Sequence, residues 1–288
     1  MNIYDYLKTY SDDLVYYCPN GGNGGDAIIA YGTYQIFNEL GIKYKIARLG
    51  DNLNNKIVIY GGGGQLVKLY DGHGLKFIQR YHNVAKKLIV LPHTINLHKK
   101  YIEKFDHNID IICREATSFD YIQKMNTKVN VFLMNDMAFN INVSYLLSKG
   151  SRITNKFHLD AHYISQWVRF NYGKLKNHFS STDLGQTLNS FRTDFDEKTD
   201  LRLPKDNFDI SSKYFAIVYT PKISLSIAFQ IFNYLNNFDI INTNRLHLAI
   251  SGAILGKSVN LYPNSYWKNE AVYFYSLKNQ YPNVNWLG

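Results

Sequence analysis

The segment NTNRLHLAISGAILG holds the two residues whose types and spacing point most directly to chemistry, Arg245 and His247. Both stand at the start of an expected helix, directly after the apolar run FDIIN. A guanidinium beside the N–H groups of a helix N-terminus makes a strong anion site. An imidazole two residues further on can transfer a proton near neutral pH. The pair therefore indicates acid–base chemistry on an anionic substrate.

A glycine-rich bend, CPNGGNGGD, joins the apolar run LVYYC to a helix expected to begin near Asp26. Glycine permits positive φ and close approach to the backbone, and a helix N-terminus favours negative charge. We expect Gly22, Gly24 and Gly25 to seat a phosphate or carboxylate of the substrate. Asp26 is expected to cap the helix and to orient or deprotonate a substrate hydroxyl. A tight turn without a ligand stays open as an alternative.

A second glycine cluster, in IVIYGGGGQL, ends another expected strand. Four consecutive glycines cost conformational entropy that a simple turn does not require. We therefore expect a ligand or another part of the chain to approach Gly62 and Gly63 closely. His93 in LPHT and Asp136 in LMND follow further expected strands, and each is as consistent with ordering a loop as with binding substrate.

Arg114, in IICREATS, follows a strand and precedes a helix that Ser118 is expected to cap. It either pairs with Glu115 or donates to a substrate anion, and we favour the second. In FRTDFDEK, Arg192 and Asp194 are as consistent with a mutual ion pair as with a site.

Short β-rich runs alternate with helical patterns through most of the chain, which predicts an α/β fold with parallel sheets. The length of 288 residues suits two domains, which we place at 1–144 and 145–288. The expected assembly is two Rossmann-like domains facing across a cleft. In the second half, YFAIVYT is expected to be a strand, and KSVNLYP the last clear one.

No run is apolar enough to span a bilayer, and the N-terminus does not resemble a signal peptide. We therefore expect a cytoplasmic protein, able to work at the inner face of the membrane.

The two cysteines, Cys18 and Cys113, lie in apolar runs and are expected to be buried and reduced. The sequence shows no cluster of metal ligands.

The net charge of +9 is spread along the chain and favours anionic partners. No nucleic-acid-binding signature is present, so phosphorylated small molecules and anionic membranes are the better candidates. The basic, aromatic segment HYISQWVRFNYGKLKNHF, residues 162–179, is expected to be an interdomain helix or to contact an anionic membrane.

The first bend fits one of two common nucleotide-binding patterns. Gly22, Gly24 and Ala27 fit the dinucleotide pattern, with Asp51 placed to bind a ribose, so a dehydrogenase stays an alternative. A P-loop is excluded, because no Lys-Ser or Lys-Thr follows the glycines.

The ordered set GGNGGD, GGGG, LPHTI, ICREATS, MNDMAF, FRTD and NTNRLHLAISGAILGK resembles the polysaccharide pyruvyl transferase family over roughly residues 14 to 275. RLHLAI carries the strongest likeness. The resemblance implies a GT-B-like fold, phosphoenolpyruvate as donor and a saccharide acceptor, which a lipid can carry. Pyruvate is then attached as a ketal, with no cofactor or metal.

By position, the resemblance implies that Arg245 and Arg114 bind the donor and that His247 is the acid. The sequence departs from the family at LPHTI and MND, where relatives often have glutamine-glycine and proline-aspartate. The alternatives are a glycosyltransferase that uses a sugar nucleotide, the dehydrogenase, and a sugar-binding module without activity.

Overall fold

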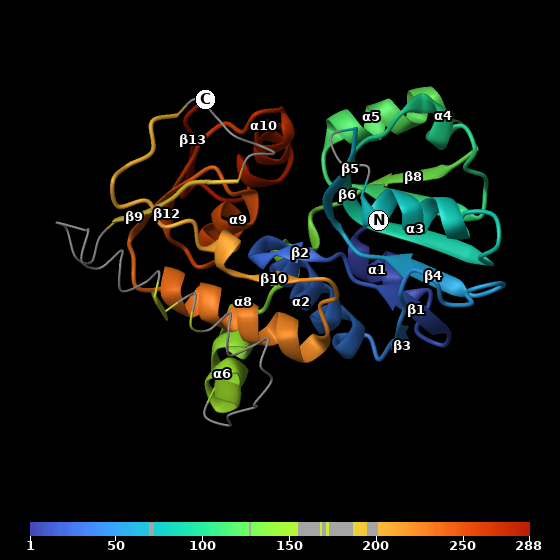
Figure 1. Ribbon diagram of the computed structural model, residues 1–288, viewed down its shortest axis with the longest axis horizontal. Helices are drawn as coiled ribbons and strands as arrows, with labels where there is room; N and C mark the ends of the chain where they lie inside the picture. The colour runs from blue at the N-terminus through green and yellow to red at the C-terminus, as the bar shows by residue number, and fades with distance from the viewer. Residues whose placement is uncertain (69–71, 127, 155–167, 169–170, 173–186, 195–200) are drawn as a thin grey trace. The chain divides into compact units, whose positions relative to one another are not determined.

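The structure is a computed structural model that describes residues 1–68, 72–126, 128–154, 168, 171–172, 187–194 and 201–288. The chain divides into two compact units, shown in Figure 1. Unit 1 comprises Met1–Asn20 and Gly32–Asn140, and unit 2 comprises Gly21–Tyr31 and Ile141–Gly288. The division falls within helix α2 (Gly24–Glu39). That 1–144 and 145–288 fold as separate domains stays a prediction.

Unit 1 is built on a parallel sheet that has seven strands among the described residues. The strand order is β3-β1-β4-β6-β7-β8, and β5 pairs with β6. The strands are β1 (Leu14–Cys18), β3 (Lys43–Ile46), β4 (Ile57–Tyr60), β5 (Gly63–Val67), β6 (Lys87–Asn96), β7 (Ile109–Cys113) and β8 (Asn130–Leu133). The predicted parallel α/β class is therefore confirmed for this unit.

The core of unit 1 explains why its strands read as continuous apolar runs. Every residue of β4 and β7 is buried, as expected for strands covered on both faces. Cys18 and Cys113 end β1 and β7, and both are buried as predicted. The helices of the unit besides α2 are α1 (Ile3–Lys8), α3 (His73–Tyr81), α4 (Lys99–Ile102), α5 (Ala116–Met125) and the 3-10 helix η1 (Met137–Asn140).

The strand order of unit 1 reverses direction beside β1. The chain passes from β1 to β3 on one side and then returns to β4 on the other. In open α/β sheets, ligands bind outside the carboxyl ends of the strands at such a switch point. Asn20 follows β1 there, and the glycines 61–64 follow β4. The Gly61 amide donates to the Cys18 carbonyl at 2.8 Å and ties the two strand ends together.

Unit 2 contains a second parallel sheet, with the order β13-β12-β11-β9 among the described residues. Its strands are β9 (Thr187–Ser190), β11 (Ile240–Thr243), β12 (Ser258–Leu261) and β13 (Val284–Trp286). The helices are α6 (Val143–Thr154), η3 (Ser211–Lys213), α8 (Pro221–Leu235), α9 (Leu246–Ile254) and α10 (Lys268–Val272), followed by a π-helix over Tyr273–Leu277. Thr220 caps α8, and Pro221 occupies its first turn, a favoured start for a helix.

A small antiparallel sheet corrects one strand prediction. YFAIVYT was expected to be a strand of the second alternation, but only β10 (Phe215–Ala216) forms, and it pairs with β2 (Gly22–Asn23) beside it (Figure 1). β2 is equally short, with two residues. KSVNLYP was expected to be the last clear strand and forms β12, but one more strand, β13, follows it.

The described part of the chain has no helix long and apolar enough to cross a membrane. The basic segment 162–179 lies outside the described residues, apart from 168, 171 and 172. Its predicted roles therefore stay predictions.

Candidate active site

The glycine-rich bend is fastened to the first turn of α2 by two side chains. The Asn23 Oδ1 atom accepts a hydrogen bond from the Gly25 amide at 2.8 Å. The Asp26 Oδ2 atom accepts one from the Asn23 amide at 2.9 Å. Asn23 therefore provides the cap that was expected from Asp26, which instead reaches back along the chain. This hydrogen bond fixes the position of the Asp26 carboxylate, which is half-buried.

The bend and the arginine–histidine segment meet within unit 2. A Cβ atom on Gly25 would lie 2.7 Å from the Nδ1 atom of His247 and 3.1 Å from the Asn23 Oδ1 atom. The imidazole thus packs directly against the backbone of the bend. Gly24 is just as tight, because a Cβ there would be 2.9 Å from the Ile231 side chain. The predicted catalytic residues Asp26 and His247 therefore belong to two segments that touch, although 220 residues separate them in the chain.

Tyr219 supports this contact and was missed by the sequence analysis. Its hydroxyl lies 2.8 Å from the Gly22 carbonyl and 2.9 Å from the Asn23 carbonyl, and donates to this pair. Burial raises the pKa of the Tyr219 hydroxyl, and the Asp26 charge raises it further, so the donor keeps its proton. Gly22 itself has φ +145°, which favours glycine. No local pattern marks Tyr219, because its partners lie about two hundred residues away in the sequence.

Arg245, the predicted donor ligand, is buried and paired with two carboxylates. Its Nε and Nη2 atoms donate to Asp209 at 2.9 and 2.5 Å, a bidentate pairing. Its Nη1 atom lies 3.0 Å from the Asp194 Oδ2 atom. Asp209 also accepts hydrogen bonds from the Thr193 amide and hydroxyl, both at 3.0 Å. The Arg245 charge is thus compensated in this structure, and its direct contact with a substrate stays a prediction.

Asp194 joins two guanidinium groups. The Nε and Nη2 atoms of Arg192 donate to its two oxygens at 2.8 and 3.0 Å, in addition to the Arg245 contact. The mutual pairing of Arg192 and Asp194 that the sequence left open is therefore present. Burial would raise the pKa of Asp194, but the hydrogen bonds and charges of both arginines outweigh it and hold the pKa at about 2. Of the three side chains, Asp194 is the most exposed, at 36%.

In unit 1, the partner of Arg114 is Asp136, not Glu115. The Arg114 Nη1 atom lies 2.7 Å from the Asp136 Oδ2 atom, with both side chains almost fully buried. The Nε atom donates to the Thr94 hydroxyl at 2.8 Å. Glu115 instead caps α5, accepting from the amide and hydroxyl of Ser118, so the expected cap by Ser118 is wrong. A direct contact of Arg114 with a substrate anion stays a prediction.

His93 lies within β6 rather than at a strand end, because β6 continues to Asn96. The residue is fully buried. Gly62 is also buried, and Gly63 begins β5 beside His93. The second glycine cluster therefore connects two strands, with Gly63 paired to His93 in the sheet.

The dinucleotide-binding alternative requires Gly22, Gly24 and Asp51 to act together. The glycines belong to unit 2 and pack against its other segments, whereas Asp51 belongs to unit 1. There the Asp51 carboxylate accepts from the Arg48 amide at 2.8 Å and closes a turn. Local structure thus accounts for Asp51 without a ribose.

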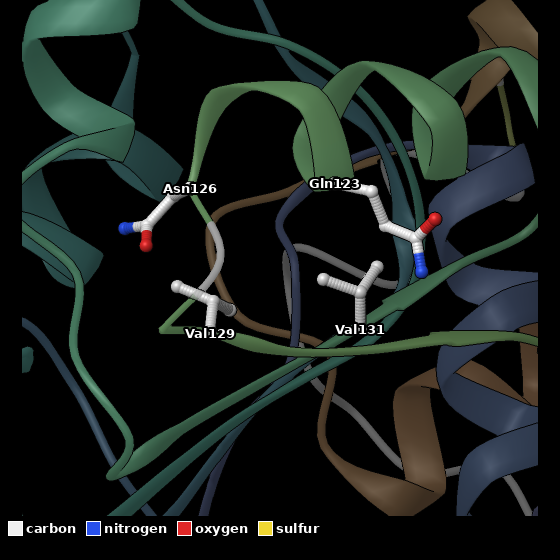
Figure 2. A pocket seen from close by; sticks show the side chains of 4 residues that line it. All are labelled: Gln123, Asn126, Val129 and Val131. Atoms are coloured by element: carbon white, nitrogen blue, oxygen red, sulfur yellow. The ribbon is translucent and has the colours of Figure 1, made fainter.

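A pocket of about 310 Å³ lies between α5 and β8. Figure 2 shows the side chains that line it. It is lined by Gln123, Asn126, Val129 and Val131. The Asn126 amide donates to the Ile102 and Phe105 carbonyls, so it is occupied in holding the backbone. None of the predicted site residues lines this pocket. Among the described residues, no group of three His, Cys, Asp or Glu side chains could hold a metal ion.

Comparison with known proteins identifies the class of this chain. The family model described as polysaccharide pyruvyl transferase matches residues 23–266, so the chain belongs to this family of transferases. The protein named "Putative pyruvyl transferase EpsO" from Bacillus subtilis is 27% identical over 309 aligned positions, covering 97% of this chain and 89% of that protein.

A solved structure shares the fold. It is a functionally uncharacterised protein of Klebsiella pneumoniae, 30% identical, which matches with a TM-score of 0.76. The match covers 99% of this chain and 96% of the other. The resemblance to the family seen in the sequence is thus confirmed.

Replacing Gly25 with alanine is expected to lower kcat by about 10²-fold, because the new methyl group must displace the His247 imidazole. The free energy of unfolding should change far less, because the φ of Gly25 lies outside the range that favours glycine. Steady-state kinetics and urea unfolding measure the two effects. Gly72→Ala is the matched control, because a Cβ there meets no atom within 4 Å. Full activity in Gly25→Ala would separate His247 from the chemistry.

Proposed function

We propose that the protein transfers the enolpyruvyl group of phosphoenolpyruvate to a saccharide and closes it into a pyruvate ketal. Family membership supports the reaction class. The observation that carries the proposal to specific residues is the packing of His247 against Gly25, one residue before Asp26. An imidazole and a carboxylate in touching segments are a suitable acid and base for this reaction.

The proposed reaction begins when the protonated His247 imidazole gives a proton to the methylene carbon of the donor. One saccharide hydroxyl forms a C–O bond to the central carbon, and Asp26 accepts the proton that it loses. The C–O bond to phosphate then breaks, and phosphate leaves with the electron pair. A second saccharide hydroxyl attacks the same carbon and gives its proton to the now neutral His247 imidazole, which closes the ketal. The proton held by Asp26 passes to the released phosphate. The balance is one donor and one diol converted to one ketal and one phosphate.

The donor needs cationic groups, and we propose that Arg192 and Arg245 provide them by exchange. Both guanidiniums already bind one carboxylate, that of Asp194. A phosphate or carboxylate of the donor has the geometry to replace it, because guanidinium pairs with either group bidentately. Asp194 is the exposed member of the cluster and can move away. Asp209 is buried and would continue to hold Arg245.

Asp194→Asn is expected to lower the KM for phosphoenolpyruvate about 5-fold, because it removes a carboxylate that competes for the same arginines. With its pKa held at about 2, Asp194 is ionised near neutral pH, so protonation does not relieve the competition there. The KM is measured by phosphate release at fixed ionic strength. Asp206→Asn is the control, since it removes the same charge from a carboxylate that binds the Asn189 amide. A raised KM in Asp194→Asn alone would contradict the exchange.

The direct test of the proposed function is phosphate release from phosphoenolpyruvate with a panel of free and lipid-linked saccharides. Release that depends on a saccharide is the expected result. Thermal-shift measurements with phosphoenolpyruvate, sugar nucleotides and NAD provide a second test, because a ligand of the folded state raises Tm. Stabilisation by a sugar nucleotide alone would favour a glycosyltransferase instead.

Three finer features stay part of this proposal. The units are proposed to adopt the GT-B-like arrangement, with two Rossmann-like domains facing across a cleft, which small-angle scattering can test.

The acceptor is proposed to be lipid-linked, with the enzyme working in the cytoplasm at the inner face of the membrane. The net charge of +9 supports contact with an anionic surface, and salt-sensitive binding to anionic vesicles tests it.

A further inference from the structure

A buried polar cluster lies at the switch point of unit 1. It consists of Asn20 after β1, Tyr60 and Gly63 around the end of β4, and His93 in β6. The Tyr60 hydroxyl donates to the Asn20 Oδ1 atom at 2.7 Å. The rings of Tyr60 and His93 stack, with centroids 5.9 Å apart. The cluster therefore occupies the position at which parallel α/β sheets bind ligands.

Three nitrogen atoms of this cluster are buried without a hydrogen-bond partner. They are the Asn20 Nδ2 atom and both ring nitrogens of His93, although the His93 ring also lies close enough to the backbone of Gly61 and Leu91 to interact with it. The exposed fractions are 3% for Asn20 and 0% for His93. Buried polar groups are nearly always hydrogen-bonded, so a group from outside the chain is the physical explanation for several unpaired atoms in one place.

Gly63 lies directly against both side chains. Its φ is +150°, and a Cβ there would lie 2.7 Å from the Asn20 Nδ2 atom and 3.6 Å from the His93 Nε2 atom. Any side chain at this position would therefore cover both nitrogens. A glycine at this position thus leaves the Asn20 Nδ2 atom and the His93 Nε2 atom without a neighbouring side chain between them.

The charges of the cluster favour an uncharged ligand. Burial lowers the pKa of His93 to about 3, with a further contribution from Arg114, so the imidazole is neutral near pH 7. The Asp136 charge and the nearby backbone of Gly61 and Leu91 oppose this shift only in part. Arg114 is itself compensated by Asp136 at 2.7 Å. A neutral imidazole offers one donor and one acceptor, and the asparagine amide offers donors. A hydroxyl group, which both donates and accepts, matches this set better than an anion.

We propose that Asn20 and His93 form a subsite for a hydroxyl group of the saccharide acceptor, with Gly63 keeping it open. This inference rests on the proposed function for the identity of the acceptor. It assigns acceptor recognition to the neutral cluster of unit 1 and leaves the donor anion to the arginines of unit 2. Loss of either polar side chain should therefore weaken saccharide binding and leave donor binding unchanged.

The test measures the binding of four methyl pyranosides to the full chain by saturation-transfer NMR, in the absence of phosphoenolpyruvate. The pyranosides are those of glucose, galactose, mannose and N-acetylglucosamine. Asn20→Ser keeps an acceptor for Tyr60 but removes the amide, and His93→Leu removes both ring nitrogens. Each is expected to raise the Kd of the best-bound glycoside about 10- to 100-fold. His93→Gln keeps a neutral donor and acceptor and should stay within about 3-fold.

Ile89→Val is the matched control, because it trims a buried side chain in the same strand without changing a polar group. If His93→Leu does not fold, Asn20→Ser and His93→Gln still decide the question. The subsite would be overturned if the wild-type protein bound none of the glycosides, or if Asn20→Ser bound them as tightly as the wild type. An ordered water would then be the partner of the buried nitrogens. Glycoside binding without any turnover of phosphoenolpyruvate would instead contradict the proposed function and leave the subsite standing.

Discussion

His247→Asn is expected to lower kcat by about 10²- to 10⁴-fold while leaving the KM for phosphoenolpyruvate nearly unchanged. The imidazole packs against Gly25 and stands at the start of α9, where it is proposed to protonate the donor carbon. Asparagine keeps a polar group of similar width but cannot deliver a proton near neutral pH. Steady-state phosphate release at saturating saccharide measures both constants.

His98→Asn is the control for this variant, because it makes the same exchange at an exposed histidine of unit 1. It should retain wild-type kinetics. A His247→Asn enzyme with unaltered kcat would remove the imidazole from proton transfer. A raised KM with unaltered kcat would make His247 a binding group instead.

Asp136→Ala is expected to lower the free energy of unfolding by about 3–5 kcal/mol. The substitution leaves the Arg114 guanidinium buried without its carboxylate partner, and both side chains are almost inaccessible to water. It also removes the oxygen that accepts from the Ala138 amide at 2.9 Å. Urea unfolding monitored by circular dichroism measures the loss.

Asp106→Ala is the matched control, since its carboxylate is 62% exposed beside an exposed histidine in the same unit. Its effect should be below about 1 kcal/mol. The double variant Arg114→Met with Asp136→Leu should recover much of the stability, because well-packed apolar pairs replace buried ion pairs at little cost. If Asp136→Ala were as stable as the wild type, the ion pair would not be a structural element.

The strands of unit 1 could be predicted from the sequence because burial on both faces leaves continuous apolar runs. KIVIY and IDIIC became β4 and β7 for this reason. LVYYC became β1, although Leu14 at its start is exposed. YFAIVYT has the same composition, yet Phe215 and Ile217 are 57% and 75% exposed. Composition identifies a run that can form a strand, but the partner strand decides how much of it does.

In the candidate site, too, features set by neighbouring residues could be predicted, whereas contacts between residues far apart in the sequence could not. The start of α9 at Arg245 and His247 followed from the local pattern and is confirmed. The contacts of Asp209 with Arg245 and of Tyr219 with Gly22 could not be predicted in this way. They join residues 36 and 197 positions apart, and contacts at such distances leave no periodic signal in the sequence. Arg114 was assigned Glu115 as its possible partner from adjacency, whereas the sheet brings Asp136 to it from the end of the next strand.

The most direct test of the central claim uses phosphoenolpyruvate labelled with carbon-13 at its central carbon, together with a saccharide that supports phosphate release. The expected product is a saccharide with a labelled quaternary ketal carbon in its NMR spectrum, formed in step with phosphate and absent with His247→Asn. Phosphate release with the label recovered only as free pyruvate, or transfer of a sugar in place of the label, would contradict enolpyruvyl transfer by this protein.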